Sequence, residues 1–170
     1  HKWGLFPSTS LAWRVSDESF MANTSSWLDN LKLRLGYGVT GNQGVLDNYA
    51  AVTRLKTSQY VFNGTPVSTL YPLVMPNPDI KWETVKQGNI GFDASLFKQR
   101  INVTFDAYVK NTTDMLVSMV VPITTGYSDI YTPMINAGKV RNTGWELTVA
   151  SQNIKGDFEW NTDFNISYNR

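Results

Sequence analysis

The sequence contains no cysteine, and His1 is its single histidine. Without cysteine the chain can form no disulfide, no thiolate metal site and no cysteine nucleophile. A catalytic triad or a histidine-based metal site would have only His1 to use. No H-E-x-x-H or EF-hand spacing occurs, and we interpret Asp114 and Asp129 as solvated loop charges in preference to calcium ligands. We therefore expect no catalytic residue, no metal and no cofactor.

Charge and long apolar runs are also scarce. Charged residues make up 17% of the sequence, whereas soluble domains usually contain about 25%. The net charge of +1 gives no electrostatic footprint for a nucleic acid. No apolar run approaches the roughly 20 residues of a membrane-spanning helix. Strands that cross a membrane need no such run, because only every second residue faces the lipid.

Apolar and polar residues alternate along most of the chain. From Ile101 to Lys110, Ile, Val, Phe, Ala and Val occupy one face, and Asn, Thr, Asp, Tyr and Lys the other. Such a period of two predicts strands with one apolar and one polar face. A length of about ten to fourteen residues exceeds the usual strand and suits one that spans a membrane at a tilt. The expected strands are Trp3–Val15, Leu31–Thr40, Trp82–Leu96, Ile101–Lys110, Val140–Ser151 and Asp157–Asn169.

The connections between these strands alternate between short and long. Lys98–Arg100 and Gln152–Gly156 are short, whereas Thr40–Lys81 and Asn111–Gly138 are long. Barrels of the bacterial outer membrane have short periplasmic turns and long extracellular loops. The pattern therefore predicts the direction in which each strand crosses the membrane.

Two segments add detail to this scheme. Ser16–Asn30 is longer than a usual periplasmic turn, and we expect a short helical turn in it. Leu116–Val121 and Ser128–Ile135 are expected to form a hairpin that extends two of the strands above the membrane.

The stretch Gly36–Gly41 matches the G-x-G-x-x-G pattern of dinucleotide-binding proteins. A nucleotide site requires this motif to leave a strand and open a helix, whereas here it lies within an alternating strand. We interpret these glycines as positions that permit close backbone approach or strand curvature.

Several ordered motifs resemble those of the SusC/RagA group of TonB-dependent outer-membrane transporters of Bacteroidetes. Leu31–Gln43 is similar to the stretch LKLR-x-SYG-x-TGNQ of that group, and Asn77–Glu83 to NP-x-LKWE. Asn136–Glu146 is similar to N-x-G-x-x-x-N-x-G-x-E. The resemblance covers nearly the whole chain. Gly36 stands where the group usually has serine, and Trp145 where it has an aliphatic residue.

The resemblance implies an all-β fold. The chain would be an antiparallel segment of about six to eight strands from a larger transmembrane β-barrel. The whole barrel has about 22 strands in this group. It implies that residues 1–170 are part of the barrel domain, without its plug and carboxy-terminal strands. It also implies a bacterial outer-membrane location, a SusD-like lipoprotein as lid, and TonB acting through an absent amino-terminal region. The transported substrate in this group is an oligosaccharide, or a peptide in some members.

Two interpretations of function follow. In the first, the chain is the wall of an importer, and loop aromatics contact the substrate; the candidates are Tyr60, Phe62, Tyr71, Tyr127 and Tyr131. In the second, the chain is a soluble carbohydrate-binding β-sandwich module, which would explain the alternation and the aromatics equally well. Long strands and alternating connection lengths favour the importer.

Overall fold

The structure is a computed structural model, and it describes residues 3–44, 46, 49–127 and 132–170. The chain divides into two compact units. We call the first the wall unit; it comprises Leu5–Thr40, Val85–Asn111 and Val140–Arg170. The second, which we call the loop unit, is formed mainly by Gly41–Thr84 and Thr112–Lys139.

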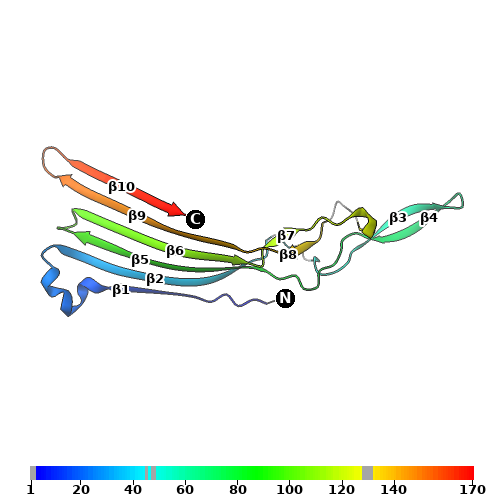
Figure 1. Cartoon of the computed structure of the whole chain (residues 1–170), viewed down its shortest axis with the longest axis horizontal. Helices are drawn as coiled ribbons and strands as arrows, with labels where there is room; N and C mark the ends of the chain where they lie inside the picture. The colour runs from blue at the N-terminus through cyan, green and yellow to red at the C-terminus, as the bar shows by residue number, and fades with distance from the viewer. Residues whose placement is uncertain (1–2, 45, 47–48, 128–131) are drawn as a thin grey trace. The chain divides into compact units, whose positions relative to one another are not determined.

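The wall unit is one sheet of six strands in the order β1-β2-β5-β6-β9-β10 (Figure 1). Each strand pairs with the next wall strand along the chain, and the arrows alternate in direction, as in an antiparallel meander. The expected antiparallel all-β fold is therefore confirmed. The bounds are Ser8–Arg14 for β1, Leu28–Asn42 for β2, Glu83–Leu96 for β5, Ile101–Thr113 for β6, Val140–Ile154 for β9 and Trp160–Asn169 for β10.

The wall strands match the expected ones except at their ends. β1 begins at Ser8 and not at Trp3, directly after Pro7, which has no N–H to donate to a neighbouring strand. The Pro7 carbonyl still accepts a hydrogen bond from the Val39 N–H at 2.9 Å. β2 begins at Leu28, three residues earlier than expected, and β10 begins later, at Trp160.

The connections at one end of the wall are short and tied to one another. Val15–Asp17 and Ser19–Thr24 form 3₁₀ helices between β1 and β2, which confirms the expected helical turn. The β5–β6 turn places Phe97, Lys98 and Gln99 at φ of 55°, 57° and 62°, a region that side chains disfavour. The Asp29 carboxylate accepts a hydrogen bond from the Gln99 N–H at 2.9 Å and so helps to hold this turn.

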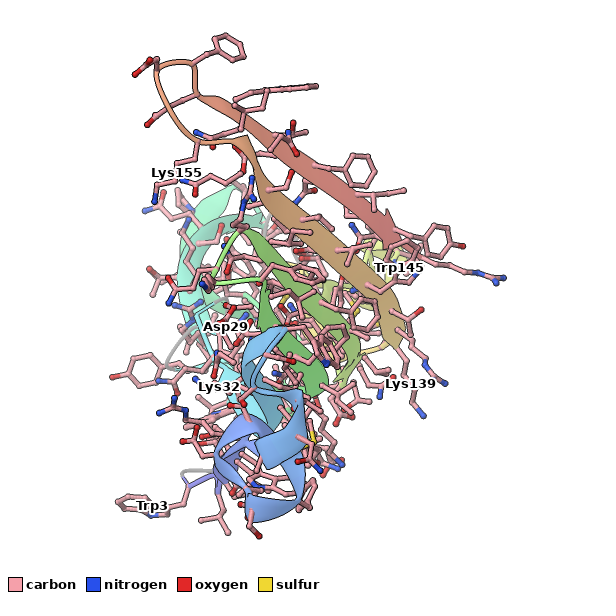
Figure 2. The ribbon with its side chains drawn as sticks, turned by 90° about the vertical axis from the view of Figure 1, so that its left-hand side faces the viewer. Trp3, Asp29, Lys32, Lys139, Trp145 and Lys155 are labelled. Carbon is pink, nitrogen blue, oxygen red and sulfur yellow. The ribbon has the colours of Figure 1, made fainter. Side chains whose placement is uncertain are left out.

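Strand register separates the side chains of the wall into two faces. Leu11 pairs with Leu35 and Trp13 with Leu33 across β1 and β2. At the other edge of the sheet Trp145 pairs with Tyr168, Leu147 with Ile166 and Val149 with Phe164. Directly paired residues share a face, so each edge of the sheet has a face on which apolar side chains are paired. Lys32 and Trp145 lie on opposite sides of the ribbon (Figure 2).

The loop unit contains two short hairpins. β3 (Leu55–Phe62) pairs with β4 (Thr65–Pro72), and β7 (Leu116–Ser118) pairs with β8 (Met134–Asn136). The second hairpin confirms the expected pairing, although its strands are shorter; residues 128–131 of the expected strand lie outside the described residues. The first hairpin was not expected, because we interpreted residues 40–81 as a single loop.

The β3–β4 hairpin turns at Asn63 and Gly64, with φ of 47° and 77°. Two consecutive positive φ values are the requirement of a type I′ turn, and Asn-Gly is its preferred sequence. The dipeptide Asn63-Gly64 was thus the signal that could have revealed the hairpin.

Few side chains are buried within the described part of the chain. The buried apolar residues are Val15 and Leu28 in the wall unit and Ile80 and Val121 in the loop unit. A single layer of strands has no second layer to cover either face, so its large side chains stay exposed unless something outside the chain covers them. Among the described residues no helix is long and apolar enough to cross a membrane.

Candidate functional site

The polar face of the wall carries an ionic cluster that joins three strands. Arg34 of β2 donates from Nη2 to Asp93 of β5 at 3.1 Å and to Asp106 of β6 at 3.0 Å. Arg34 Nε also lies 2.9 Å from Asp93 Oδ2, as an ion pair without hydrogen-bond geometry. The three side chains are 30%, 33% and 37% exposed, so water screens the pairs only in part. We call Arg34, Asp93 and Asp106 the ionic triad.

Gly91 of β5 makes space for the ionic triad. A Cβ built on Gly91 would collide with the Asp106 carboxylate, and it would lie 2.7 Å from the Phe105 carbonyl and 3.1 Å from Arg34 Nη2. The Phe105 carbonyl belongs to the backbone, so it cannot simply rotate away. The guanidinium group therefore reaches across β5 to β6 only because position 91 has no side chain.

At two other glycines of the same face, a neighbouring side chain also occupies the space that a Cβ atom would need. A Cβ on Gly36 would lie 2.5 Å from the Asn89 Oδ1, so the asparagine amide occupies the space that the serine usual at this position would need. A Cβ on Gly144 would collide with the Asn169 side chain, which accepts a hydrogen bond from the Tyr108 hydroxyl at 2.7 Å. Gly36 therefore makes room for the Asn89 side chain, whereas we expected close backbone approach or strand curvature for the G-x-G-x-x-G stretch.

A shallow groove of about 500 Å³ lies over the edge of this polar face at β1, β2 and β5. Its polar lining comes from Ser10, Arg34, Thr40, Gln87 and Asn89, and Gly36 and Gly38 form its floor. Hydroxyl, amide and guanidinium groups that converge above two glycines can donate to and accept from a polar partner. We did not identify this groove from the sequence, because its residues come from three separate segments.

The opposite face carries a row of stacked aromatic rings. Phe92 and Phe105 stack with their centroids 5.7 Å apart, and Phe105 and Trp145 do so at 6.4 Å. The row crosses β5, β6 and β9 and continues through the pair of Trp145 with Tyr168 on β10. Partly or fully exposed apolar side chains over four strands are characteristic of a surface that meets lipid.

Three of the candidate aromatic residues lie on one face of the β3–β4 hairpin. Tyr60 and Phe62 of β3 are 63% and 70% exposed, and Tyr71 of β4 is partly exposed. The register pairs Tyr60 with Val67, Phe62 with Thr65 and Lys56 with Tyr71, so all three rings share this face. Tyr127 follows the 3₁₀ helix Ile123–Thr125 in a different part of the loop unit, and Tyr131 lies outside the described residues.

Asn136 holds the base of the loop unit together. Its Oδ1 accepts from the Lys81 N–H, and its Nδ2 donates to the carbonyls of Lys81 and Asp114, each at 2.8 Å. Asn77 adds a bond from Nδ2 to the Met134 carbonyl at 2.9 Å. The two asparagines belong to motifs that supported the family resemblance, and the structure shows that they fasten one loop to the other.

The described residues contain no group of three or more His, Asp or Glu side chains able to hold a metal ion. Asp114 has a φ of 55° and its carbonyl is bonded by Asn136. Asp129, the second aspartate considered from the sequence, lies outside the described residues.

Comparison with known families gives one description for the whole chain. The family model described as "TonB dependent receptor-like, beta-barrel" matches residues 1–170.

Curated relatives carry the same kind of name. The chain is 40% identical over 168 residues to TonB-dependent receptor P39 of Formosa agariphila, and 34% identical over 174 residues to TonB-dependent receptor SusC of Bacteroides thetaiotaomicron. These alignments cover 98% and 99% of this chain but only 15% and 17% of the relatives. The 170 residues thus span about a sixth of the length of these proteins.

Solved structures agree with this result. The structure of the RagAB peptide importer in its "open-open" state matches with a TM-score of 0.78 and 28% identity, and its "closed-closed" state with a TM-score of 0.77. Both matches cover 97% of this chain and 17% of the chain that they match.

Proposed function

The chain belongs to the family of TonB-dependent receptor-like β-barrels, and from this premise we propose that it is part of the wall and external loops of an outer-membrane importer. The importer would take up oligosaccharides or peptides and work with a SusD-like lipoprotein. The observation that carries the proposal is the two-sided wall, with stacked aromatic rings on one face and the ionic triad on the other. Such faces suit a barrel strand that stands between lipid and a wet lumen.

Family membership removes the alternative of a soluble carbohydrate-binding sandwich. The family is a membrane barrel, and the matching relatives are named TonB-dependent receptors. An isolated sheet with two open edges is not viable in lipid, so the full barrel must supply strands beside β1 and β10. We propose that residues 1–170 are a segment of that barrel, with the plug and the contact to TonB in other parts of the transporter.

The proposal leaves two classes of transported substrate, peptides and oligosaccharides. The name of the RagAB structure describes a peptide importer, and its similarity to this chain supports a peptide as cargo. Exposed aromatic rings on the β3–β4 hairpin support an oligosaccharide equally, because a flat apolar ring can stack on a sugar. We retain Tyr60, Phe62, Tyr71, Tyr127 and Tyr131 as proposed contacts, of which the first three share a face.

A paired set of variants in the full-length transporter tests this proposal. Tyr60→Ser with Phe62→Ser removes two rings from one face of the hairpin, and Val61→Ser on the opposite face is the control. We expect uptake of the cognate fluorescent oligopeptide or oligosaccharide to fall in the double variant only, with unchanged amounts of barrel in the membrane. Equal uptake by both variants would remove these rings from the substrate site.

A second experiment tests the importer itself. Deletion of the full-length gene should abolish growth on one class of oligomer, and loss of TonB should have the same effect. A SusD-like lipoprotein should co-purify with the transporter. Normal growth on both oligopeptides and oligosaccharides after deletion would contradict the proposal.

A further inference from the structure

Gly88 of β5 differs from the glycines of the polar face. No atom lies within 4 Å of a Cβ built on Gly88, whereas the corresponding Cβ atoms on Gly36, Gly91 and Gly144 meet neighbouring side chains. Gly88 is also not among the glycines with positive φ, so an L-residue could adopt its backbone conformation. Neither the packing of this chain nor its backbone requires glycine at this position, although glycine weakens a strand.

The missing side chain leaves a hollow on the apolar side of the wall. The hollow has a volume of about 470 Å³, and its side chains are Leu35 and Tyr37 from β2, Ile90 from β5, and Ala107 and Val109 from β6. Ile90 is 59% exposed and Tyr37 is 48% exposed, so these side chains border an open depression and do not close over it. We call this depression the Gly88 hollow. All of its residues belong to the wall unit.

A lysine lies on the same face, one step along the strand. Lys86 is two residues before Gly88, so the two positions project to the same side of β5. Lys86 lies nearer Glu83, the end of β5 that follows the long segment between β2 and β5. Its side chain is exposed, and within the described part of the chain it makes no ion pair. The Lys86 side chain therefore projects from the same face of β5 as the hollow, on the side nearer Glu83, although Lys86 is not among the residues that line the hollow.

The apolar face of an outer-membrane barrel meets lipid, and this decides what covers the hollow. A membrane lipid has an apolar chain joined to a phosphate, which matches an apolar hollow beside a lysine. We propose that the Gly88 hollow binds an acyl chain of a phosphate-bearing lipid of the outer leaflet, and that Lys86 contacts its phosphate. The site rests on the position of the wall in the membrane and not on the substrate of the importer.

Photocrosslinking of the full-length transporter tests the site. The protein is reconstituted in vesicles of phosphatidylethanolamine and phosphatidylglycerol that contain a phosphatidylglycerol probe with a diazirine on its acyl chain. We expect labelling enriched at Leu35, Tyr37 and Val109 relative to Phe164 on the same face of β10. Labelling that is equal along the whole apolar face would overturn the proposal.

Three variants separate the contribution of the open volume at Gly88 from that of the charge on Lys86. Gly88→Leu fills the hollow and should reduce labelling there to the level found elsewhere on the face, whereas Ala94→Leu, on the same face of β5, should leave it unchanged. Lys86→Gln should lower labelling by the phosphatidylglycerol probe about fivefold, the effect expected of one lysine at an anionic lipid surface. It should not affect a diacylglycerol probe, which has no phosphate.

Two further results would also contradict the proposal. Crosslinks from the hollow to a second copy of the transporter, lost in Gly88→Leu, would show that a protein covers the hollow and not a lipid. Unchanged labelling in both Gly88→Leu and Lys86→Gln would show that the hollow is not selective. If Gly88→Leu fails to assemble, Gly88→Ala and Lys86→Gln give the same comparison with smaller changes in volume.

Discussion

Arg34 and Asp106 are hydrogen-bonded although a whole strand lies between those that carry them. Arg34 is on β2 and Asp106 on β6, with β5 between the two, and Arg34 Nη2 lies 3.0 Å from Asp106 Oδ2. The pair spans 72 residues of sequence. The long guanidinium side chain passes over Gly91, so one residue links three strands of the wall.

Replacing Arg34 should therefore destabilise the barrel. Arg34→Met leaves Asp93 and Asp106 close together without their cation, and we expect a loss of about 1–3 kcal/mol in the free energy of unfolding. The measurement is thermal unfolding of the detergent-purified full-length barrel, followed by its heat-dependent shift in gel mobility. Lys32→Met, on the same face of β2 and without an ion pair in the described part of the chain, is the control.

A double-mutant cycle distinguishes the ion pair from a general effect of the arginine. Arg34→Met combined with Asp106→Asn should show a coupling energy of about 0.5–3 kcal/mol. Strictly additive losses would mean that the contact seen between these two side chains contributes nothing to stability.

Replacement by alanine should have opposite effects on stability at two glycines of β5, Gly91 and Gly88. Gly91→Ala drives a methyl group against the Phe105 carbonyl and the Asp106 carboxylate, so we expect a loss of about 1–3 kcal/mol. Gly88→Ala places the methyl group in open space and should be neutral or stabilising by about 0.4–1 kcal/mol. Midpoints of thermal unfolding for the two variants give the comparison, and similar midpoints would contradict the packing described at Gly91.

Asn136→Ala should loosen the base of the loop unit. It removes the bonds to Lys81 and Asp114 and leaves backbone groups without partners, at a cost of about 1–3 kcal/mol. Limited proteolysis of the full-length protein should cleave the segments Gly41–Thr84 and Thr112–Lys139 faster, while the strands of the wall stay protected. Asn23→Ala, an exposed asparagine in the 3₁₀ helix Ser19–Thr24, is the matched control.

Asn136→Asp refines this test. The carboxylate keeps an acceptor for the Lys81 N–H but loses both donated bonds, so proteolysis should still accelerate. A cleavage rate equal to that of the unmodified protein would assign the asparagine no role in fastening the loops.

Lys98→Gly should stabilise the β5–β6 turn. Lys98 has a φ of 57°, and the left-handed conformation costs a side-chain-bearing residue about 1–2 kcal/mol. Part of this gain is lost because glycine adds freedom to the unfolded chain, so we expect a net gain below about 1 kcal/mol. Lys155→Gly, in the β9–β10 turn where φ is not positive, should be destabilising by the same measurement of the unfolding midpoint.

The wall strands could be predicted from the sequence because each strand shows its own alternation of apolar and polar residues. Alternation along Ile101–Thr113 assigns every residue to a face without reference to any other strand. Alternation does not determine the strand ends, since pairing partners decide where a ladder stops. The β3–β4 hairpin was missed because both of its faces carry exposed apolar residues, so Leu55–Phe62 shows no clear alternation.

The sequence by itself determined the antiparallel wall, its two faces, the alternation of short and long connections, and the family. These properties are local or are carried by ordered motifs. Only the tertiary structure decided that Arg34 meets Asp93 and Asp106, that Asn136 fastens two loops, and that Gly88 lies above open space while Gly91 lies under a carboxylate. The physical reason is register: which side chains meet across a sheet depends on the pairing of strands that lie far apart in sequence, and a shift of one residue would exchange the two faces.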